Sequence, residues 1–189
     1  MRRKIVAIVG DADIEENSTK YKMAYEMGKA LVDAGYRIQS GGLQGVMNAA
    51  FCGAHASKNY KEGDTIAIVP GFNPNDANQF ADITIGTGLD MFRNVIVGNA
   101  QAIIAIGGGS GTLSEVANAW ALKRMILAFN NVDGWSSKVA DIRMDQRIRY
   151  EDIPDDRVYG VSSAEEAIKI INERIEKYNI YHTHIPKNH

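Results

Sequence analysis

Short apolar runs alternate with helix-forming segments along most of this chain, and glycine closes several of the runs. Lys4–Val9 (KIVAIV) and Ala102–Ile106 (AIIAI) are the clearest examples, and Gly10 and Gly107 follow them directly. Runs this short and this apolar are typical of strands buried on both faces of a sheet. Strands that alternate with helices predict βαβ units, which build a mostly parallel sheet between two helical layers.

Flanking residues help to place the expected elements. Ser18 is a suitable N-cap for the first helix, and Gly35 ends it. The predicted strands are Lys4–Val9, Tyr36–Ser40, Thr65–Val69, Asp82–Ile85, Ala102–Ile106, Met125–Phe129 and Val158–Val161. The predicted helices are Ser18–Ala34, Gly45–Ser57, Met91–Asn99, Leu113–Lys123 and Ala164–Tyr178, with Ser163 as the last cap. We therefore expect an α/β fold, a Rossmann-like three-layer αβα sandwich with about six or seven mostly parallel strands.

Length and charge limit the function classes. The 189 residues suit one domain, which we expect to span residues 1–180 and to be followed by a short tail at 181–189. The net charge of −2 offers no broad basic surface for nucleic acid. No run reaches the roughly 18 apolar residues of a membrane span, and the first apolar run is too short for a signal peptide. The single cysteine excludes an internal disulfide framework. We expect a cytoplasmic protein that binds neither nucleic acid nor membranes.

Glycines at predicted strand ends mark a ligand site. Gly10, Gly41–Gly42 and Pro70–Gly71 all follow strands, at the edge where open α/β sheets bind ligands. The stretch GGGSGT at 107–112 is the richest, and a helix begins after it. Glycines allow close approach to the backbone, and a helix N-terminus offers free N–H groups to an anion. We therefore predict a phosphate site formed by Gly108, Gly109, Ser110, Gly111 and Thr112. A tight turn without a ligand is the alternative.

The spacing of this stretch excludes two common nucleotide motifs. A P-loop requires a lysine after its last glycine, whereas Thr112 follows Gly111 here. The dinucleotide fingerprint requires glycine at its sixth position, and Thr112 occupies that position as well. The pattern therefore favours a phosphate-bearing ligand other than NAD.

Glu115 is the first acidic residue after these glycines. With a helix that starts near Thr112, it falls in the first turn, where the helix dipole stabilises a carboxylate. It therefore either stabilises the helix start or faces the phosphate crevice. A carboxylate in the crevice is able to activate water or to stabilise a developing positive charge.

Three stretches of the chain resemble a known family. GGGSGTLSE (107–115) resembles the P-G-G-x-G-T-x-x-E signature of the Lonely Guy family of cytokinin riboside monophosphate phosphoribohydrolases. SGGLQGVMNAA (40–50) resembles the family's second-strand signature, and MFRN (91–94) stands where the family carries its catalytic arginine. Related sequences often carry the label "possible lysine decarboxylase". The whole pattern is closer to a sister branch that includes proteins similar to the molybdenum cofactor carrier.

The resemblance implies an activity and assigns residues to it. It implies hydrolysis of the N-glycosidic bond of a nucleoside 5′-monophosphate, with Arg93 and Glu115 as the catalytic pair and without a metal or other required cofactor. The glycine-rich stretch and Thr112 would hold the 5′-phosphate. The further residues expected to line the pocket are Gly10, Asp11, Gly41, Gly42, Gly45, Met47, Pro70, Gly71 and Asn94. For Asp11, contact with a ligand hydroxyl and plain solvation in a loop are both open.

Departures from the family pattern support a second function. Gly107 replaces the family's proline, and the family's His-x-Arg-Lys cluster is reduced to Phe92, Arg93 and Asn94. The alternative is a carrier or binding protein for molybdenum cofactor or a nucleotide, without turnover. Lysine decarboxylation is not expected, because a pyridoxal enzyme requires a Schiff-base lysine and no lysine stands at a predicted strand end.

Two further expectations concern surfaces. The segments Met91–Asn99 and Leu113–Lys123 carry apolar residues on more than one face, and the resembling family is dimeric or larger, so we expect a homodimer or higher homo-oligomer. The apolar residues concerned are Val95, Ile96, Val97, Leu113, Val116 and Trp120. The segment Asp141–Arg157 is dense in both charges and is expected to be a solvated excursion.

Overall fold

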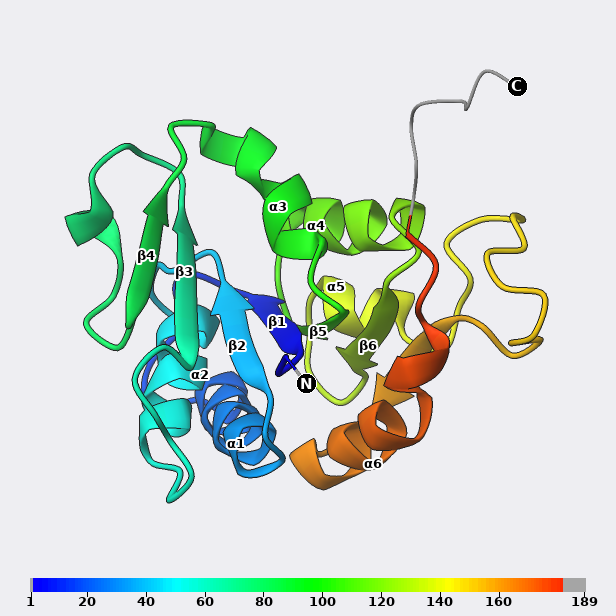
Figure 1. Cartoon of the computed structure of the whole chain (residues 1–189), viewed down its shortest axis with the longest axis horizontal. Coiled ribbons are helices and arrows are strands. Elements are labelled where there is room, and N and C mark those ends of the chain that lie inside the picture. Colours follow the sequence, from blue (N-terminus) through cyan, green and yellow to red (C-terminus); the bar gives the residue numbers. More distant parts are fainter. Residues whose placement is uncertain (1, 182–189) are drawn as a thin grey trace.

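A single seven-stranded sheet organises the molecule, with the strand order β4-β3-β2-β1-β5-β6-β7 (Figure 1). The computed structural model describes residues 2–181, and each neighbouring pair of strands in this sheet is parallel. The strands are β1 (Ile5–Gly10), β2 (Arg37–Ser40), β3 (Thr65–Val69), β4 (Ile83–Gly86), β5 (Ala102–Ile106), β6 (Met125–Phe129) and β7 (Val158–Val161). The predicted Rossmann-like α/β class is therefore confirmed, and each strand end lies within one residue of its predicted place.

Helices cover both faces of the sheet. The helices α1 (Thr19–Asp33), α2 (Val46–His55) and α6 (Ala164–Arg174) pack on one face, and α3 (Asn94–Gly98), α4 (Ser110–Ala121) and α5 (Trp135–Val139) pack on the other (Figure 1). Side chains along β1 alternate between the two cores, with Ile8 in the first and Val9 in the second. Ser18 caps α1 by accepting a hydrogen bond from the Tyr21 amide, as predicted.

The crevice for a ligand follows from this topology. β1 lies between β2 and β5, and the chain reaches β5 only after it has built β2, β3 and β4 on the other side. The helix after β1 therefore covers one face of the sheet, whereas the helix after β5 covers the opposite face. The loops that follow β1 and β5 therefore run to opposite faces of the sheet and leave a crevice between them. Open α/β sheets bind their ligands at this point, where the strand order reverses.

Three helix predictions need correction. α4 starts at Ser110, whereas the apolar pattern placed its start at Leu113, because Ser110 and Gly111 are poor helix formers by propensity. The predicted helix Met91–Asn99 is a 3₁₀ turn (Asp90–Arg93) that continues into the short helix α3. The last helix ends at Arg174 and is followed by the 3₁₀ turn Ile175–Lys177. The short helix α5 was not predicted, because its five residues show no apolar period.

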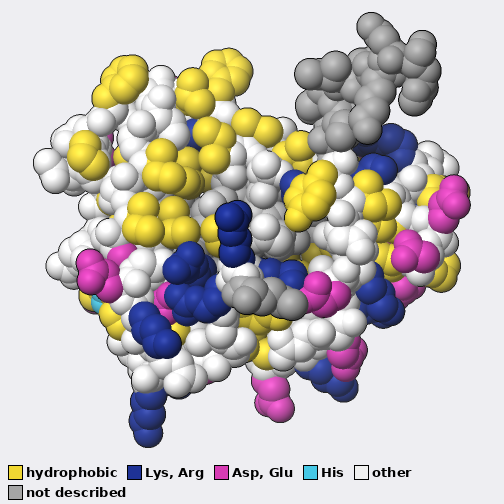
Figure 2. Space-filling model, in the orientation of Figure 1, with side chains coloured by type: hydrophobic (Ala, Val, Ile, Leu, Met, Phe, Trp, Pro, Cys, Tyr) yellow, Lys and Arg dark blue, Asp and Glu magenta, His cyan; other side chains and the backbone are white. Residues whose placement is uncertain are grey.

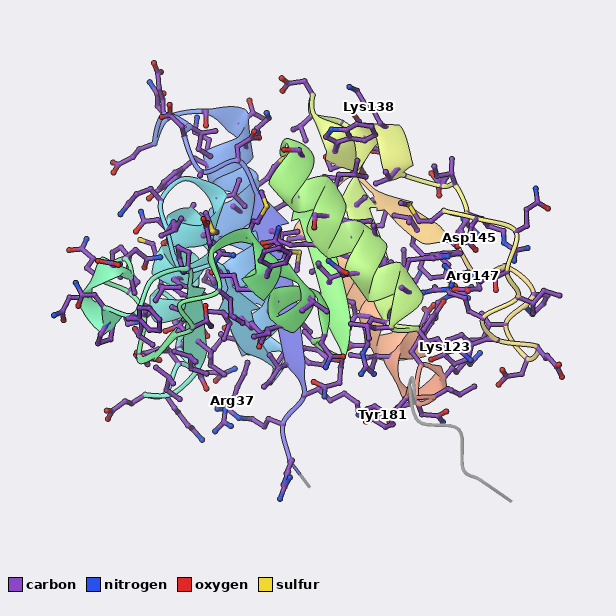
Figure 3. All side chains as sticks on the ribbon, turned by 90° about the horizontal axis from the view of Figure 1, so that it is seen from above. Arg37, Lys123, Lys138, Asp145, Arg147 and Tyr181 are labelled. Atoms are coloured by element: carbon purple, nitrogen blue, oxygen red, sulfur yellow. The ribbon has the colours of Figure 1, made fainter. Side chains whose placement is uncertain are left out.

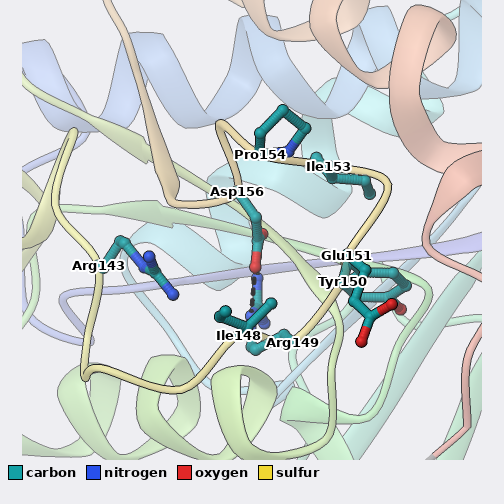
Figure 4. A pocket seen from close by; sticks show the side chains of 8 residues that line it. All are labelled: Arg143, Ile148, Arg149, Tyr150, Glu151, Ile153, Pro154 and Asp156. Atoms are coloured by element: carbon teal, nitrogen blue, oxygen red, sulfur yellow. Dashed lines mark hydrogen bonds and ion pairs between the residues drawn. The ribbon is translucent and has the colours of Figure 1, made fainter.

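The prediction that Asp141–Arg157 is a solvated excursion was wrong for the end of that segment. Arg149 and Asp156 are both buried there, and Nε and Nη2 of Arg149 lie 2.8 Å and 2.6 Å from the two Asp156 carboxylate oxygens (Figure 4). The Arg149 guanidinium also lies over the Trp120 ring, 3.7 Å from its centre. Asp145 and Arg147, in contrast, pair with each other on the outer loop (Figure 3). The charges therefore anchor one end of the segment to the second core.

Two further expectations concerned membrane-spanning segments and the C-terminal tail. Within residues 2–181, none of the helices combines the length and the apolar character needed to cross a bilayer. Residues 182–189 of the predicted tail lie outside the residues that the structure describes.

Candidate functional site

A cleft of about 310 Å³ opens at the carboxyl ends of β1 and β5, where the topology places the crevice. Its wall combines the loop after β1, the start of α2, the 3₁₀ turn before α3, and the first turns of α4. The lining residues are Gly10, Asp11, Ala12, Leu43, Met47, Arg93, Asn94, Gly109, Ser110, Gly111, Thr112 and Glu115. The structure thus brings ten of the predicted site residues to one cleft, and adds Ala12 and Leu43.

The first two glycines of the stretch after β5 have conformational roles. Gly107 and Gly108 have φ angles of +65° and +92°, a region that other residues rarely adopt. A Cβ atom on Gly108 would lie 2.2 Å from Thr112 Oγ1. The carbonyl groups of Gly107 and Gly108 accept hydrogen bonds from the Ser136 and Trp135 amides, so the unpredicted helix α5 supports this loop from behind.

The amides of these two glycines are already used. The Gly107 N–H donates to Ser136 Oγ at 2.8 Å, and the Gly108 N–H donates to Asp11 Oδ2 at 2.9 Å. Gly108 was predicted to give its amide to a phosphate. The structure corrects that expectation, because the carboxylate of Asp11 already accepts this hydrogen bond.

The next four amides are free and lie at the N-terminus of α4. The first hydrogen bond of this helix runs from the Leu113 N–H to the Gly109 carbonyl, and no side chain among the described residues caps the end. The N–H groups of Gly109, Ser110, Gly111 and Thr112 therefore have no partner among residues 2–181, as expected at a helix start. A Cβ atom at position 109 or 111 would meet nothing within 4 Å, and both residues line the cleft. Free amides and the positive end of the helix dipole together favour an anion.

Arg93 and Glu115 meet in the wall of the cleft. Glu115 is the sixth residue of α4, so it lies in the second turn and not in the first turn as predicted. This placement removes the alternative in which it merely stabilises the helix start. Arg93 Nη1 lies 3.9 Å from Glu115 Oε1, and both side chains are buried. Burial raises the pKa of Glu115 to about 7, against the opposing effect of the Arg93 charge.

The Arg93 guanidinium occupies space that Gly41 leaves open. A Cβ atom on Gly41 would lie 3.0 Å from Nη2, so the absence of a side chain makes room for the guanidinium. Nη1 donates a hydrogen bond to Asn94 Oδ1 at 3.3 Å. Nε is buried and has no hydrogen-bond partner among the described residues. A buried N–H without a partner is uncommon in native structures.

The remaining predicted pocket residues support the cleft from outside or lie elsewhere. Gly42 packs on Ala67 in β3, and a Cβ atom on Gly45 would lie 2.3 Å from the Asp11 carbonyl. Pro70 and Gly71 accept hydrogen bonds from the amides of the segment after β4, away from the lining of the cleft. Ser136 accepts a hydrogen bond from the glycine loop, and Lys20 pairs with Asp11 and packs beside Gly107. No sequence motif marked either residue, because both reach the loop only across the fold.

A family model matches residues 3–168 and is that of the SLOG cluster4 family. The chain belongs to the SLOG cluster4 family. The family model does not identify the chain as a Lonely Guy protein in particular, and that likeness rests on the three sequence motifs alone. A protein of Archaeoglobus fulgidus is 38% identical over 120 residues, which make up 63% of this chain and 75% of that protein.

Two solved structures have the same fold as this SLOG cluster4 chain. The molybdenum cofactor binding protein from the phototrophic bacterium Rippkaea orientalis is 30% identical, covers 93% of this chain and 99% of its own, and superposes with a TM-score of 0.75. The molybdenum cofactor carrier protein from Chlamydomonas reinhardtii is 26% identical, with coverage of 93% and 99% and a TM-score of 0.70. Among residues 2–181, no group of three or more His, Cys, Asp or Glu side chains is placed to hold a metal ion.

Proposed function

We propose that this chain binds a phosphate-bearing small molecule of the pterin class in the cleft, as a carrier that does not turn its ligand over. The observation that carries the proposal is the set of four free amides from Gly109 to Thr112, which opens into the same cleft as the buried Arg93. The likeness to a molybdenum cofactor binding protein and to a molybdenum cofactor carrier protein supports this class of ligand.

The residues of the cleft fit such a cargo. The free amides match a phosphate ester at the helix start. Arg93 lines the cleft, so its positive charge is available to attract an anionic group of the ligand. Glu115 accepts no hydrogen bond from the described residues, so its carboxyl group is free to pair with an N–H or O–H of the ligand. In this proposal the metal belongs to the cargo, and the chain supplies only the cleft.

A transfer assay tests the carrier function. Purified protein is mixed with molybdenum cofactor released from a donor enzyme, separated from free cofactor by gel filtration, and assayed for molybdenum and for pterin. We expect the wild-type protein to retain both and the Gly109→Val variant to retain neither. Equal amounts of cofactor on both proteins would contradict binding at the helix start.

Hydrolysis of nucleoside 5′-monophosphates is the second candidate, and one observation favours it. A Glu115 carboxyl with a pKa of about 7 is ionised in a large fraction of molecules at neutral pH and is able to accept a proton from water. Water would then attack the sugar carbon of the glycosidic bond, and the base would leave with a proton. Positive charge that develops on the sugar would be stabilised by the carboxylate. Incubation with a panel of these nucleotides, followed by chromatography for free base, tests it, with Glu115→Gln as the control.

We also propose that the protein is a homo-oligomer located in the cytoplasm. Figure 2 shows hydrophobic side chains gathered over the sheet edge at β4 and over the segment that leads into α3. The exposed residues concerned are Phe72, Ile83, Ile85, Leu89, Met91, Phe92, Val95 and Ile96, here called the apolar patch. Val97, Val116 and Trp120, which were expected to add to such a surface, are buried in the core instead. A patch of this kind typically marks a contact with another protein surface.

A further inference from the structure

Asp11 places a carboxylate in the wall of the cleft, close to the free amides at the start of α4. Its Oδ2 accepts the Gly108 amide at 2.9 Å and its backbone carbonyl accepts the Val46 amide at 2.9 Å. The side chain therefore fixes the glycine loop, and the main chain fixes the start of α2. A negative charge at this position would also repel a phosphate at the neighbouring amides. The fold must therefore compensate for this charge if phosphate binds there.

Lys20 provides the compensating charge from outside the cleft. Its Nζ lies 2.8 Å from the same Oδ2 of Asp11 and 3.0 Å from Asp133 Oδ1. Its aliphatic stem runs beneath the glycine loop, where a Cβ atom on Gly107 would lie 2.8 Å from Lys20 Cε. Lys20 lines a separate hollow between the start of α1 and the loop after β6, and it does not line the cleft. Its contact with the phosphate site therefore runs through Asp11.

The two partners of Lys20 differ in their surroundings. The Asp11 side chain is 27% exposed, whereas that of Asp133 is 92% exposed. Water screens the exposed pair strongly, so Asp133 contributes little to holding the lysine. Although burial disfavours a charged amine, hydrogen bonds to both carboxylates raise the pKa of Lys20. The ammonium and the Asp11 carboxylate thus form one compact pair beside the loop.

We propose that Asp11 and Lys20 act as one electrically neutral unit, in which Asp11 fixes the glycine loop and Lys20 determines phosphate affinity without touching the ligand. This inference rests on the proposed function, because it assumes an anion at the amides of Gly109–Thr112. In this arrangement Lys20 is a positioning residue that acts through Asp11. Removal of each partner should then shift phosphate affinity in opposite directions, which a purely structural contact would not do.

A double-mutant cycle with inorganic phosphate tests the unit. Affinity is measured by calorimetry for wild type, Lys20→Met, Asp11→Asn and the double variant. Lys20→Met keeps the packing beneath Gly107 but leaves the carboxylate unpaired, so we expect phosphate affinity to fall by about 10-fold. Asp11→Asn still accepts the Gly108 amide but leaves the positive charge of Lys20 uncompensated, so phosphate affinity should rise. The double variant should bind phosphate about as tightly as wild type, because the site is again without net charge when both partners are replaced.

Controls separate this effect from damage to the fold. Asp133→Asn removes the exposed partner of Lys20 and should leave phosphate affinity unchanged. Lys20→Gln serves as a second variant if Lys20→Met does not fold. Added salt should narrow the difference between Lys20→Met and wild type, because the loss is electrostatic.

The outcomes distinguish the inference from the proposed function. If wild type binds phosphate and Lys20→Met binds it equally well, the neutral unit is refuted while the phosphate site stands. If Lys20→Met and the double variant lose affinity equally, the pair is only structural. If wild type binds no phosphate, the proposed site itself fails, and this inference fails with it.

Discussion

Arg93 Nη1 lies 3.9 Å from Glu115 Oε1, beyond hydrogen-bonding distance, although both side chains are buried in the wall of the cleft. An ion pair at that distance compensates only partly for the loss of water around the two charges. The consequence is a carboxyl group whose pKa rises to about 7 and a guanidinium whose pKa burial lowers. The two groups therefore form no hydrogen bond with each other, and the Glu115 carboxyl oxygens are free to accept one from a ligand.

The raised pKa of Glu115 predicts how stability depends on pH. Because the folded-state pKa of about 7 exceeds the ordinary value of 4.5, the folded protein holds the proton more tightly than the unfolded chain. The resulting stability is fully present below pH 4.5 and is lost as the pH rises through 7. The shift corresponds to about 3 kcal/mol in the free energy of unfolding. We expect the Glu115→Gln variant to lack most of this decline, as measured by urea unfolding between about pH 5 and pH 8.

The matched control for this experiment is Glu173→Gln, which changes an exposed glutamate on α6. Its unfolding free energy should follow the wild-type pH curve. If Glu115→Gln also runs parallel to wild type across the range, Glu115 is ionised in the folded protein at low pH and the raised pKa is wrong.

Local signals in the sequence were sufficient to predict most of the fold. The apolar run Ala102–Ile106 and the cap Ser163 each specify their element without help from distant residues. The glycine stretch after β5 marked the cleft, because a strand end followed by glycines and a helix is itself local. Arg93 was predicted as a site residue only from the family resemblance, because no neighbouring residue in the sequence indicates that it lies close to Glu115.

Features that depend on contacts across the fold were missed. The bond from Gly108 to Asp11 joins residues 97 positions apart, so the sequence offered no reason to remove Gly108 from the phosphate donors. The burial of Arg149 was missed for a related reason. A segment rich in both charges is usually solvated, and only the fold brings its guanidinium over Trp120 and beside Asp156.

The buried pair of Arg149 and Asp156 gives a second prediction, about stability. Both side chains are at most 5% exposed, and Tyr178 Oη also donates to Asp156 at 2.8 Å. Arg149→Met leaves the carboxylate buried without its cation, so we expect a loss of about 3–5 kcal/mol in unfolding free energy by urea titration. Arg147→Met, on the exposed pair of the same segment, should change it by less than about 1 kcal/mol. Equal effects of the two substitutions would show that Arg149 is not buried in solution.

The apolar patch gives a third prediction, about assembly. If it forms the contact between subunits, the double variant Met91→Lys/Val95→Lys should be a monomer by light scattering, because two charges in an apolar contact are strongly unfavourable. Ile148→Lys is the control, since Ile148 is 72% exposed but lies in the segment before β7 at the opposite end of the sheet. A wild-type mass equal to that of a monomer would contradict the oligomer, and an unchanged oligomer in the double variant would place the contact elsewhere.

Gly108 and Gly109 are neighbours with opposite expected responses to substitution, and their comparison tests the phosphate site. Gly109 has a φ of −101° and nothing within 4 Å of a Cβ atom, so Gly109→Val should fold with a loss of about 1 kcal/mol or less. Gly109 lines the cleft beside the free amides, so we expect the added side chain to lower phosphate affinity by at least about 10-fold. Gly108→Ala should instead destabilise the fold by about 1–3 kcal/mol, because φ is +92° and its Cβ would meet Thr112. Thermal unfolding and phosphate calorimetry on both variants separate the two effects. A Gly109→Val protein that binds phosphate as tightly as wild type would show that the anion does not rest on the start of α4.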